Sequence, residues 1–282
     1  MTQGPQLPRP TWFVGCGNMG SAIVQGWRIA GIDLSNLTVI DPFVAAIDDV
    51  RVEAELAEAG PPPRLVVLAV KPQTLDEVAA QLKPWLTSRA TIVSILAGVE
   101  VASLKQRFPN ANAIVRVMPN LPAAVRRGVV GLYSHDADDA TREQLGNLFA
   151  ALGFAMWMAD EKKLAALGSL AGAGPAYAAR FIDALAKAGE RLGLTREIAS
   201  TLALETVLGA AWMAATKNES MEDVARRVAS PNGTTEAGLK VLDGDGALDD
   251  LVARTIDAAS KRGEELAAAA KAPSLAGSAS LH

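Results

Sequence analysis

A glycine-rich run near the start of the chain is the clearest group of residues able to do chemistry. Its members are Gly15, Cys16, Gly17, Asn18, Met19 and Gly20. The run lies between a predicted strand and a predicted helix, the context in which G-x-G-x-x-G indicates a dinucleotide phosphate loop. Gly15 permits a tight turn, Gly17 lets the backbone approach a pyrophosphate, and Gly20 lets the helix pack closely on the sheet. An ordinary glycine turn is the alternative.

A carboxylate follows the second predicted strand. Asp41 stands where an acidic side chain accepts from the 2′-hydroxyl of the adenosine ribose, which favours NAD over NADP. Asp41 and Pro42 also suit the start of a turn, so the choice of cofactor stays open. Cys16 either lends only its backbone to the phosphate loop or has special reactivity.

The third predicted strand ends in Ala69, Val70, Lys71 and Pro72. This is the carboxyl edge of the sheet, where ligands of open α/β sheets bind. Lys71 either contacts the nucleotide or is an ordinary solvated lysine.

A second polar segment, residues 230–236, interrupts two predicted helices far along the chain. Small polar and hydroxyl side chains at a helix N-terminus leave several backbone N–H groups pointing outward together. Such a terminus binds a carboxylate well. An ordinary capped turn, with Glu236 in the first turn, is the alternative.

Acid–base and metal chemistry have few candidates. His135 lies in a polar loop and His282 is the last residue, so both are expected to be exposed rather than catalytic. A Ser/His/Asp hydrolase is disfavoured for the same reason, and with Cys16 as the one cysteine no metal site is expected. The residues favour reduction of a double bond that is already activated.

The predicted secondary structure changes near residue 160, from alternating strands and helices to helices alone. Before it, apolar runs alternate with helical patterns, which indicates repeated βαβ units. Strands are predicted at 11–14, 37–40, 65–70, 91–96, 113–118, 129–133 and 154–158, with helices at 21–30 and 44–59. The fold class predicted here is an α/β Rossmann-type dinucleotide-binding domain over residues 1–160.

Beyond residue 160 the apolar spacing is helical throughout, and no strand is expected. Helices are predicted at 163–169, 176–192, 196–216, 221–228, 235–242 and 247–270, followed by a disordered tail at 272–282. We therefore predict an all-α second domain over residues 161–282. Several of these helices are apolar all round, which favours burial in a dimer interface over packing within one domain.

Composition limits the partners and the cellular setting that can be expected. The chain has 282 residues and a net charge of −4, which gives no reason to expect a nucleic acid or an anionic membrane as partner. No uninterrupted apolar run approaches the ~20 residues of a membrane span, and the proline-rich start lacks the pattern of a signal peptide. One cysteine cannot form an internal disulfide, so a cytoplasmic setting is expected.

Several ordered motifs give the chain a resemblance to pyrroline-5-carboxylate reductase from about Thr11 to Leu266. They are G-C-G-N-M-G at 15–20, A-V-K-P at 69–72, S-I-L-A-G-V at 94–99, M-P-N-L-P at 118–122, G-A-G-P-A-Y at 172–177 and, most specific, S-P-N-G-T-T at 230–235. Leu121 departs from the usual threonine of the fourth motif. The resemblance implies an NADPH- or NADH-dependent oxidoreductase that reduces the cyclic imine 1-pyrroline-5-carboxylate to L-proline, the last step of proline biosynthesis.

The resemblance also implies roles for residues. The substrate carboxylate would be held by Ser230, Gly233, Thr234 and Thr235, and the Thr235 hydroxyl would be catalytic, assisting protonation of the ring nitrogen. The cofactor would be bound by Gly15, Cys16, Gly17, Asn18, Met19, Asp41, Ala69, Val70, Lys71, Pro72, Ala97 and Asn120. A homodimer through the helical domain is implied, with larger rings of dimers in the family.

Two other functions remain open at this point. One is a reductase of another imine or of a 2-hydroxy acid with the same two-domain architecture. The hydroxy-acid version needs a histidine or lysine early in the second domain, where only Lys162 and Lys163 stand. The other is a nucleotide-binding regulator without catalysis, against which the intact 230–235 loop argues.

Overall fold

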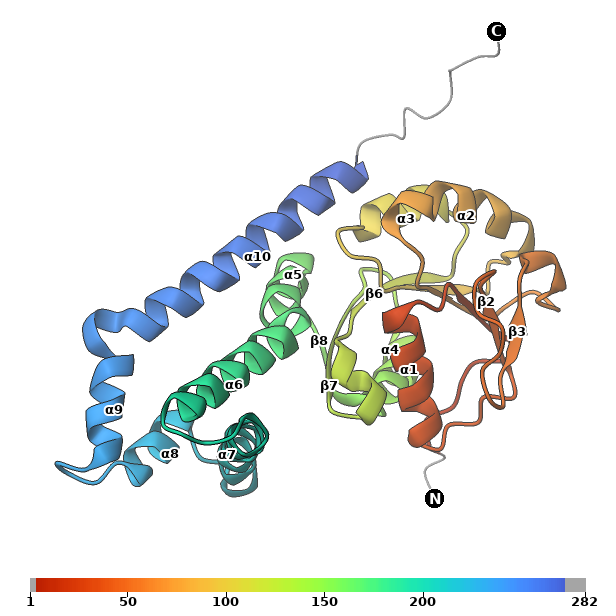
Figure 1. The fold of residues 1–282 in the computed structure, drawn as a ribbon. Coiled ribbons are helices and arrows are strands. Elements are labelled where there is room, and N and C mark those ends of the chain that lie inside the picture. The colour runs from red at the N-terminus through yellow and green to blue at the C-terminus, as the bar shows by residue number, and fades with distance from the viewer. Residues whose placement is uncertain (1–3, 272–282) are drawn as a thin grey trace, which may run out of the picture. The chain divides into compact units, whose positions relative to one another are not determined.

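An eight-stranded sheet forms the centre of the N-terminal part of the chain in the computed structural model, which describes residues 4–271 (Figure 1). The strand order is β3-β2-β1-β4-β5-β6-β7-β8, and all neighbouring strands are parallel except β6 and β7. The strands are β1 (Thr11–Val14), β2 (Leu37–Ile40), β3 (Arg51–Glu53), β4 (Leu65–Leu68), β5 (Thr91–Ser94), β6 (Ala113–Met118), β7 (Gly128–Tyr133) and β8 (Gly153–Trp157). The predicted Rossmann-type sheet is confirmed.

The central strands end level with one another. Val14 of β1 pairs with Ile40 of β2 on one side and with Leu68 of β4 on the other, and Leu68 pairs in turn with Ser94 of β5. Because these strands are parallel and in step, the loops that follow them meet at one edge of the sheet. This edge is where the sequence places its phosphate loop, Asp41 and Lys71.

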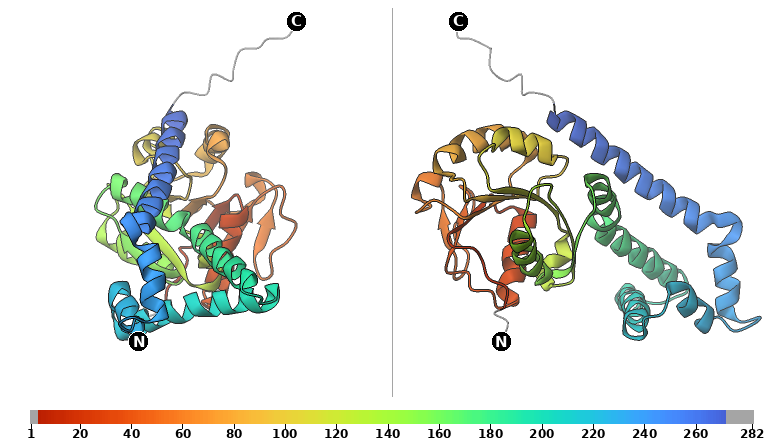
Figure 2. Two further views of the ribbon diagram at one scale, coloured as in Figure 1. Left: turned by 60° about the vertical axis from the view of Figure 1, so that its left-hand side comes forward. Right: turned by 180° about the vertical axis from the view of Figure 1, so that it is seen from behind.

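Helices cover both faces of the sheet. Helices α1 (Asn18–Ile29) and α4 (Asp139–Ala150) lie on one face, and α2 (Leu75–Leu82) and α3 (Val101–Arg107) lie on the other (Figures 1 and 2). Successive strand side chains alternate between the two layers, as the period of a strand requires. Thus Phe13 packs beneath α1 while its neighbour Trp12 packs with α2 and α3.

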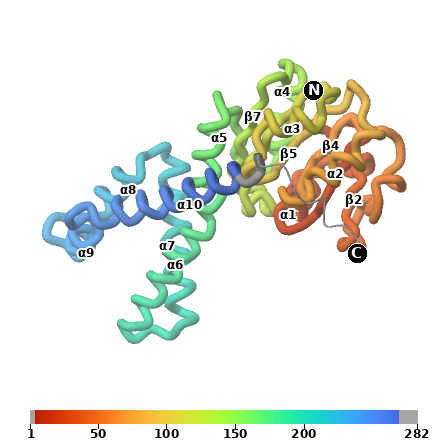
Figure 3. Tube along the Cα trace, turned by 90° about the horizontal axis from the view of Figure 1, so that it is seen from above, coloured from red at the N-terminus to blue at the C-terminus, as the bar shows by residue number. Residues whose placement is uncertain are grey.

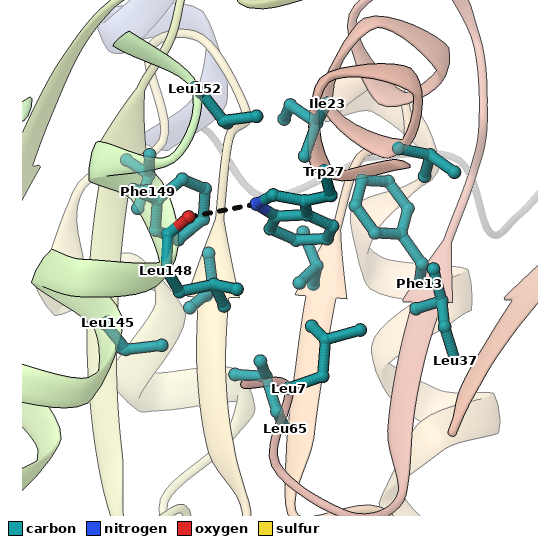
Figure 4. Packing of buried hydrophobic residues seen from close by; sticks show 14 of the residues in the cluster. Leu7, Phe13, Ile23, Trp27, Leu37, Leu65, Leu145, Leu148, Phe149 and Leu152 are labelled. Atoms are coloured by element: carbon teal, nitrogen blue, oxygen red, sulfur yellow. Dashed lines mark hydrogen bonds between the residues drawn. The ribbon is translucent and has the colours of Figure 1, made fainter. Parts of the chain in front are cut away.

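Trp27 is the centre of the layer under α1 and α4 (Figure 4). Its ring is fully buried, lies edge-on to Phe13 and is tilted against Phe149, with centroids 6.0 Å and 5.7 Å away. The indole N–H donates to the backbone oxygen of Leu148 at 3.1 Å, so the buried polar atom is satisfied. One side chain therefore joins the first helix, the first strand and α4.

The helix predicted at residues 44–59 is wrong. Most of that segment is irregular, and it contains the edge strand β3 and a short 3₁₀ helix at Leu56–Glu58. β3 pairs in parallel with β2, so the backbone donors and acceptors along that edge of β2 are satisfied by pairing. The alternating Arg51-Val52-Glu53 suits an edge strand better than a helix, and pairing with β2 outweighs the weak helical spacing.

The chain beyond β8 is helical, and the described residues 161–271 contain no strand. By its internal contacts the described chain as a whole divides into two compact units, one made of residues 4–173 with 259–271 and the other of Gly174–Ala258. The helices are α5 (Glu161–Leu167), a π turn at Gly168–Gly172, α6 (Gly174–Arg191), α7 (Arg196–Lys217), α8 (Met221–Val228), α9 (Thr234–Leu242) and α10 (Ala247–Lys271). The predicted tail at 272–282 lies outside the described residues.

Small residues bring α6 and α7 together (Figure 3). Ala186 of α6 is buried with Ala199 and Ala203 of α7, and a Cβ on Gly189 would lie 3.2 Å from the Ala199 Cβ. Alanine and glycine let two helix backbones approach closely, which explains the alanine-rich sequence of this unit.

The other sides of α7 are apolar and exposed. Ile198, Leu202, Leu208 and Trp212 each expose half or more of their surface. The helix is long enough and apolar enough to cross a membrane by length and composition alone, with a mean hydropathy of 1.4 in its most apolar window. The prediction concerned uninterrupted apolar runs and still holds, because Glu205 interrupts the apolar run of α7.

We predict that Trp27→Ala lowers the free energy of unfolding by about 3–5 kcal/mol, because it removes a fully buried ring and leaves a cavity between α1 and α4. Urea denaturation followed by circular dichroism measures the change. Phe43→Ala is the control: Phe43 is 93% exposed, and the expected change is within about 0.5 kcal/mol. Equal effects of the two variants would contradict this account of the core.

Candidate functional site

The glycine loop begins with a residue that no other amino acid can replace without strain. Gly15 has a φ of +86°, and a Cβ there would lie 2.8 Å from the Ala69 carbonyl oxygen. Gly20 is confined to a lesser degree, because its Cβ would lie 3.1 Å from the ring of Phe13 and from the Gly15 carbonyl oxygen. The first glycine therefore makes the turn possible, and the last one sets α1 close to the sheet.

Gly17 differs from its two neighbouring glycines because the space beside it is open. No heavy atom lies within 4 Å of the position of an added Cβ. Gly17 is the N-cap of α1, no side chain caps this helix, and its first turn has no acidic residue. The free N–H groups and the positive end of the helix dipole thus face an open, shallow cradle, which suits an anion.

Asp41 ties the phosphate loop to the next strand. Its Oδ2 accepts from the backbone N–H of Cys16 at 2.6 Å, and its Oδ1 accepts from the N–H of Phe43 at 2.8 Å. The second bond closes a turn after β2, which is the alternative role left open for this residue. The first bond fixes the loop after β1 against the loop after β2.

A cleft of about 1080 Å³ opens at this edge of the sheet. It brings together the predicted residues Gly15, Cys16, Gly17, Asp41, Ala69, Val70 and Lys71. The remaining predicted cofactor residues do not line it: Asn18 and Met19 begin α1, Pro72 begins a 3₁₀ helix, Ala97 is exposed after β5, and Asn120 is buried. The cleft thus joins the loops after β1, β2 and β4.

The side chain of Asn120 is already engaged by the protein. Its Oδ1 accepts from the Val129 N–H at 2.8 Å, and its Nδ2 donates to the Ala171 carbonyl at 2.9 Å. Both bonds are partly buried, so the amide joins the end of β6 to β7 and to the π turn. Leu121, the departure from the family motif, follows it and is 53% exposed.

Cys16 is a buried thiol. Burial raises its pKa, the Asp41 carboxylate adds to this increase, and a hydrogen bond with Ser21 opposes it. A thiol with a raised pKa stays protonated at neutral pH and is a weak nucleophile. This favours the interpretation of Cys16 as a small residue that lends its backbone to the loop.

The second polar segment forms an uncapped helix N-terminus in the unit Gly174–Ala258, which we call the helical unit. Gly233 is the N-cap of α9 and has no side-chain capping bond, and its N–H donates to the Ser230 carbonyl at 3.0 Å. A Cβ on Gly233 would collide with the Ser230 Oγ unless that side chain rotated, and it would lie 3.0 Å from the Ser230 carbonyl oxygen, so this turn favours glycine. Within the described residues the Thr234 and Thr235 hydroxyls make no hydrogen bond, which leaves them available to a ligand.

Glu236 supports this turn from the first turn of the helix. Its Oε2 accepts from the Asn232 N–H at 2.6 Å, and its Oε1 lies 3.1 Å from the Lys240 Nζ. Asn232 has a φ of +59°, a conformation that asparagine adopts more readily than most residues. The carboxylate thus holds the peptide before the N-cap, and the first-turn N–H groups remain open.

Sequence reasoning missed part of the cleft and one buried ion pair. Phe43, Glu55 and Trp85 also line the cleft, and Glu55 lies in the segment that was wrongly predicted as a helix. Arg116 in β6 is buried and bonds Glu161 of α5 at 2.7 Å. A lone arginine in the apolar run of β6 was the available signal, since buried charges are generally paired.

Comparison with known proteins agrees with this geometry. A family model described as "Pyrroline-5-carboxylate reductase dimerisation" matches residues 161–266. A curated pyrroline-5-carboxylate reductase of Pseudomonas aeruginosa is 41% identical over 266 residues, which is 90% of this chain and 96% of that protein. The chain belongs to the pyrroline-5-carboxylate reductase family. It is therefore an NAD(P)-dependent oxidoreductase, and the predicted resemblance is confirmed.

Solved structures of the family share the whole architecture. The Plasmodium falciparum pyrroline carboxylate reductase, solved with NADP bound, has a TM-score of 0.83 at 27% identity and covers 94% of this chain and 100% of its own. A pyrroline-5-carboxylate reductase from Coxiella burnetii has a TM-score of 0.82 at 33% identity, with 92% and 99% coverage. A second family model, "NADP oxidoreductase coenzyme F420-dependent", matches residues 12–98.

We predict that Gly15→Ala and Gly17→Ala separate folding from nucleotide binding. Gly15→Ala forces a side chain into a left-handed turn against β4, so the free energy of unfolding should fall by at least about 1 kcal/mol. Gly17→Ala should leave it within about 0.5 kcal/mol but weaken NAD(P)H binding about tenfold, since its Cβ projects into the cradle. Urea denaturation and calorimetric titration measure the two quantities. Full nucleotide affinity in Gly17→Ala would contradict the cradle.

Proposed function

We propose that this member of the family reduces the C=N bond of 1-pyrroline-5-carboxylate to give L-proline, the last step of proline biosynthesis, with NADPH or NADH as reductant. The observation that carries the proposal is the uncapped N-terminus of α9, where an open glycine turn and two unengaged hydroxyls offer a site for a carboxylate. The open cradle at Gly17 offers a site for the pyrophosphate of the second reactant, the reduced dinucleotide.

The residues of the first unit fit a dinucleotide. The cleft after β1, β2 and β4 is about 1080 Å³, and the cradle at its floor combines free N–H groups with a helix dipole. In this proposal Gly15, Cys16, Gly17, Ala69, Val70 and Lys71 hold the nucleotide, and Asn18, Met19, Pro72 and Ala97 contribute around the edge. Asn120 acts only indirectly, by holding the end of β6 in place. When bound, the reduced nicotinamide supplies the hydride.

The residues of the helical unit bind the substrate. The first-turn N–H groups of α9, together with Ser230, Gly233 and Thr234, hold the substrate carboxylate and fix the orientation of the ring. The protonated imine is already electrophilic, so the reaction depends on positioning more than on a strong acid. Hydride adds to carbon and a proton stays on nitrogen, which gives the secondary amine of proline.

Thr235 is the proposed catalytic residue. Its hydroxyl stands at the second position of α9, makes no hydrogen bond within the described residues and is half-buried. It donates to or accepts from the ring nitrogen and so holds the proton there.

The alternative reduction of a 2-hydroxy acid finds no support from a residue near either site. That chemistry needs a histidine or lysine base, yet Lys162, Lys163 and His135 are exposed. Lys71 is the one such residue lining the cleft among the described residues, and it is exposed at the rim.

We propose that the helical unit forms a homodimer, with larger rings of dimers possible for the family, and that the protein works in the cytoplasm. The match of residues 161–266 to a dimerisation domain and the exposed apolar sides of α7 support this assembly. A second copy would cover the apolar surface that otherwise resembles a membrane span. Neither a nucleic acid nor a membrane is needed as a partner.

We predict that the wild type oxidises NAD(P)H in the presence of 1-pyrroline-5-carboxylate and that Thr235→Ala lowers kcat/KM about 10²-fold, because the hydroxyl no longer assists at nitrogen. The absorbance of the reduced nicotinamide measures the rate. Thr235→Ser keeps the hydroxyl and should retain most of the activity. Absence of turnover by the wild type would refute the function, while an unchanged Thr235→Ala would remove only the role of Thr235.

We predict that the protein in detergent-free buffer has about twice the 29.4 kDa mass of one chain, or a multiple of that value, by light scattering. Leu208→Glu should lower the mass to one chain, because it places a charge on the exposed apolar side of α7. Ala80→Glu introduces the same charge on an exposed position of α2 and should leave the mass unchanged. A monomeric wild type would contradict the dimer.

A further inference from the structure

The Asp41 carboxylate is fixed in place at the adenosine end of the cleft. Each of its oxygens accepts one backbone N–H, from Cys16 at 2.6 Å and from Phe43 at 2.8 Å, and the side chain is half-buried. Rotation of the side chain would break both bonds and release the phosphate loop from the turn after β2. The negative charge therefore cannot move away to make room for a bound anion.

The turn that follows Asp41 offers nothing that recognises a phosphate. Pro42, Phe43, Val44 and the two alanines after them carry neither a hydroxyl nor a cation. Recognition of a 2′-phosphate in a Rossmann fold needs a group such as a nearby arginine.

Two arginines on neighbouring elements, Arg28 and Arg51, are engaged by other partners. Arg28 of α1 pairs with Asp48 at 3.1 Å, so its charge lies on the loop beyond the turn. Arg51 of β3 bonds Glu53 at 2.7 Å and the Glu58 carbonyl at 2.5 Å. Neither lines the cleft.

The charge of the cleft is mainly negative. Asp41, Glu55 and Glu77 line it, and Lys71 is its one cation among the described residues. Lys71 follows β4, which pairs with β1 on the side opposite to β2, so it starts from the far side of the phosphate loop. Within the described residues the ribose end therefore has the Asp41 carboxylate and no cation of its own.

We propose that Asp41 is the specificity-determining residue of the cofactor site and that this enzyme selects NADH over NADPH; the inference rests on the proposed function. A carboxylate has about four acceptor positions, and two remain for the ribose 2′-hydroxyl after the backbone bonds are made. A 2′-phosphate would instead meet a fixed like charge. One family member was solved with NADP bound, so the preference has to arise from this chain's own turn.

The test is calorimetric titration of the full-length protein with ADP-ribose and with 2′-phospho-ADP-ribose, two fragments that lack the nicotinamide. We expect ADP-ribose to bind about tenfold more tightly or better, as a like charge a few ångströms away requires. Asp41→Ser and Asp41→Asn should each reduce that ratio at least about fivefold, even where the loss of the Cys16 bond weakens both ligands.

Asp49→Asn is the matched control. It removes a carboxylate from the same loop, lies outside the cleft, and has a φ of 62° that asparagine also adopts. Its ratio should equal that of the wild type. A wild type that binds 2′-phospho-ADP-ribose as tightly as ADP-ribose, or that binds neither, overturns the proposal, and so does an unchanged ratio in both Asp41 variants.

A parallel assay of turnover with NADH and with NADPH separates this proposal from the proposed function. Reduction of 1-pyrroline-5-carboxylate by the wild type with NADPH at the efficiency of NADH would overturn the selectivity and leave the function intact. Binding of ADP-ribose with no turnover of the imine by either cofactor would refute the function, while the binding ratio would still decide the selectivity.

Discussion

The nucleotide half of this enzyme depends on the close approach of the first glycine of the phosphate loop to the end of β4. At Gly15 the backbone turns through a left-handed conformation with a carbonyl of the neighbouring strand only 2.8 Å from where a Cβ would be. That contact is possible because β1, β2 and β4 end level with one another. A shift of one residue in any strand would displace the loop and close the cradle in front of α1.

Asp41 links the phosphate loop to the loop that follows β2. Its two backbone hydrogen bonds convert the ends of β1 and β2 into one unit, and the carboxylate becomes part of the scaffold. A residue that serves the scaffold in this way has a fixed charge as a consequence. The proposed specificity would then have the same cause as the structural role, because the fixed carboxylate still has acceptor positions free for a ribose hydroxyl.

The helical unit follows a different principle, in which small residues bring helices together and apolar ones remain exposed. Ala186, Ala199 and Gly189 pack α6 on α7, but larger side chains of α7 such as Ile198, Leu202 and Leu208 remain half exposed. The hydrophobic effect alone makes such a surface costly in water. The proposed dimer would remove that cost and would explain why the length and composition of α7 alone resemble a membrane span.

The sequence by itself determined the strand positions, the phosphate loop, the helical second half and the 230–235 signature, because these rest on local patterns of apolar spacing, glycine and hydroxyl residues. It failed at residues 44–59, where pairing with β2 outweighed the local preference. Only the tertiary structure decided which polar atoms are engaged: the amide of Asn120 is already bonded within the fold, and the carboxylate of Asp41 is fixed to two backbone N–H groups. Such hydrogen bonds join residues from separate elements, so no local pattern in the sequence specifies them.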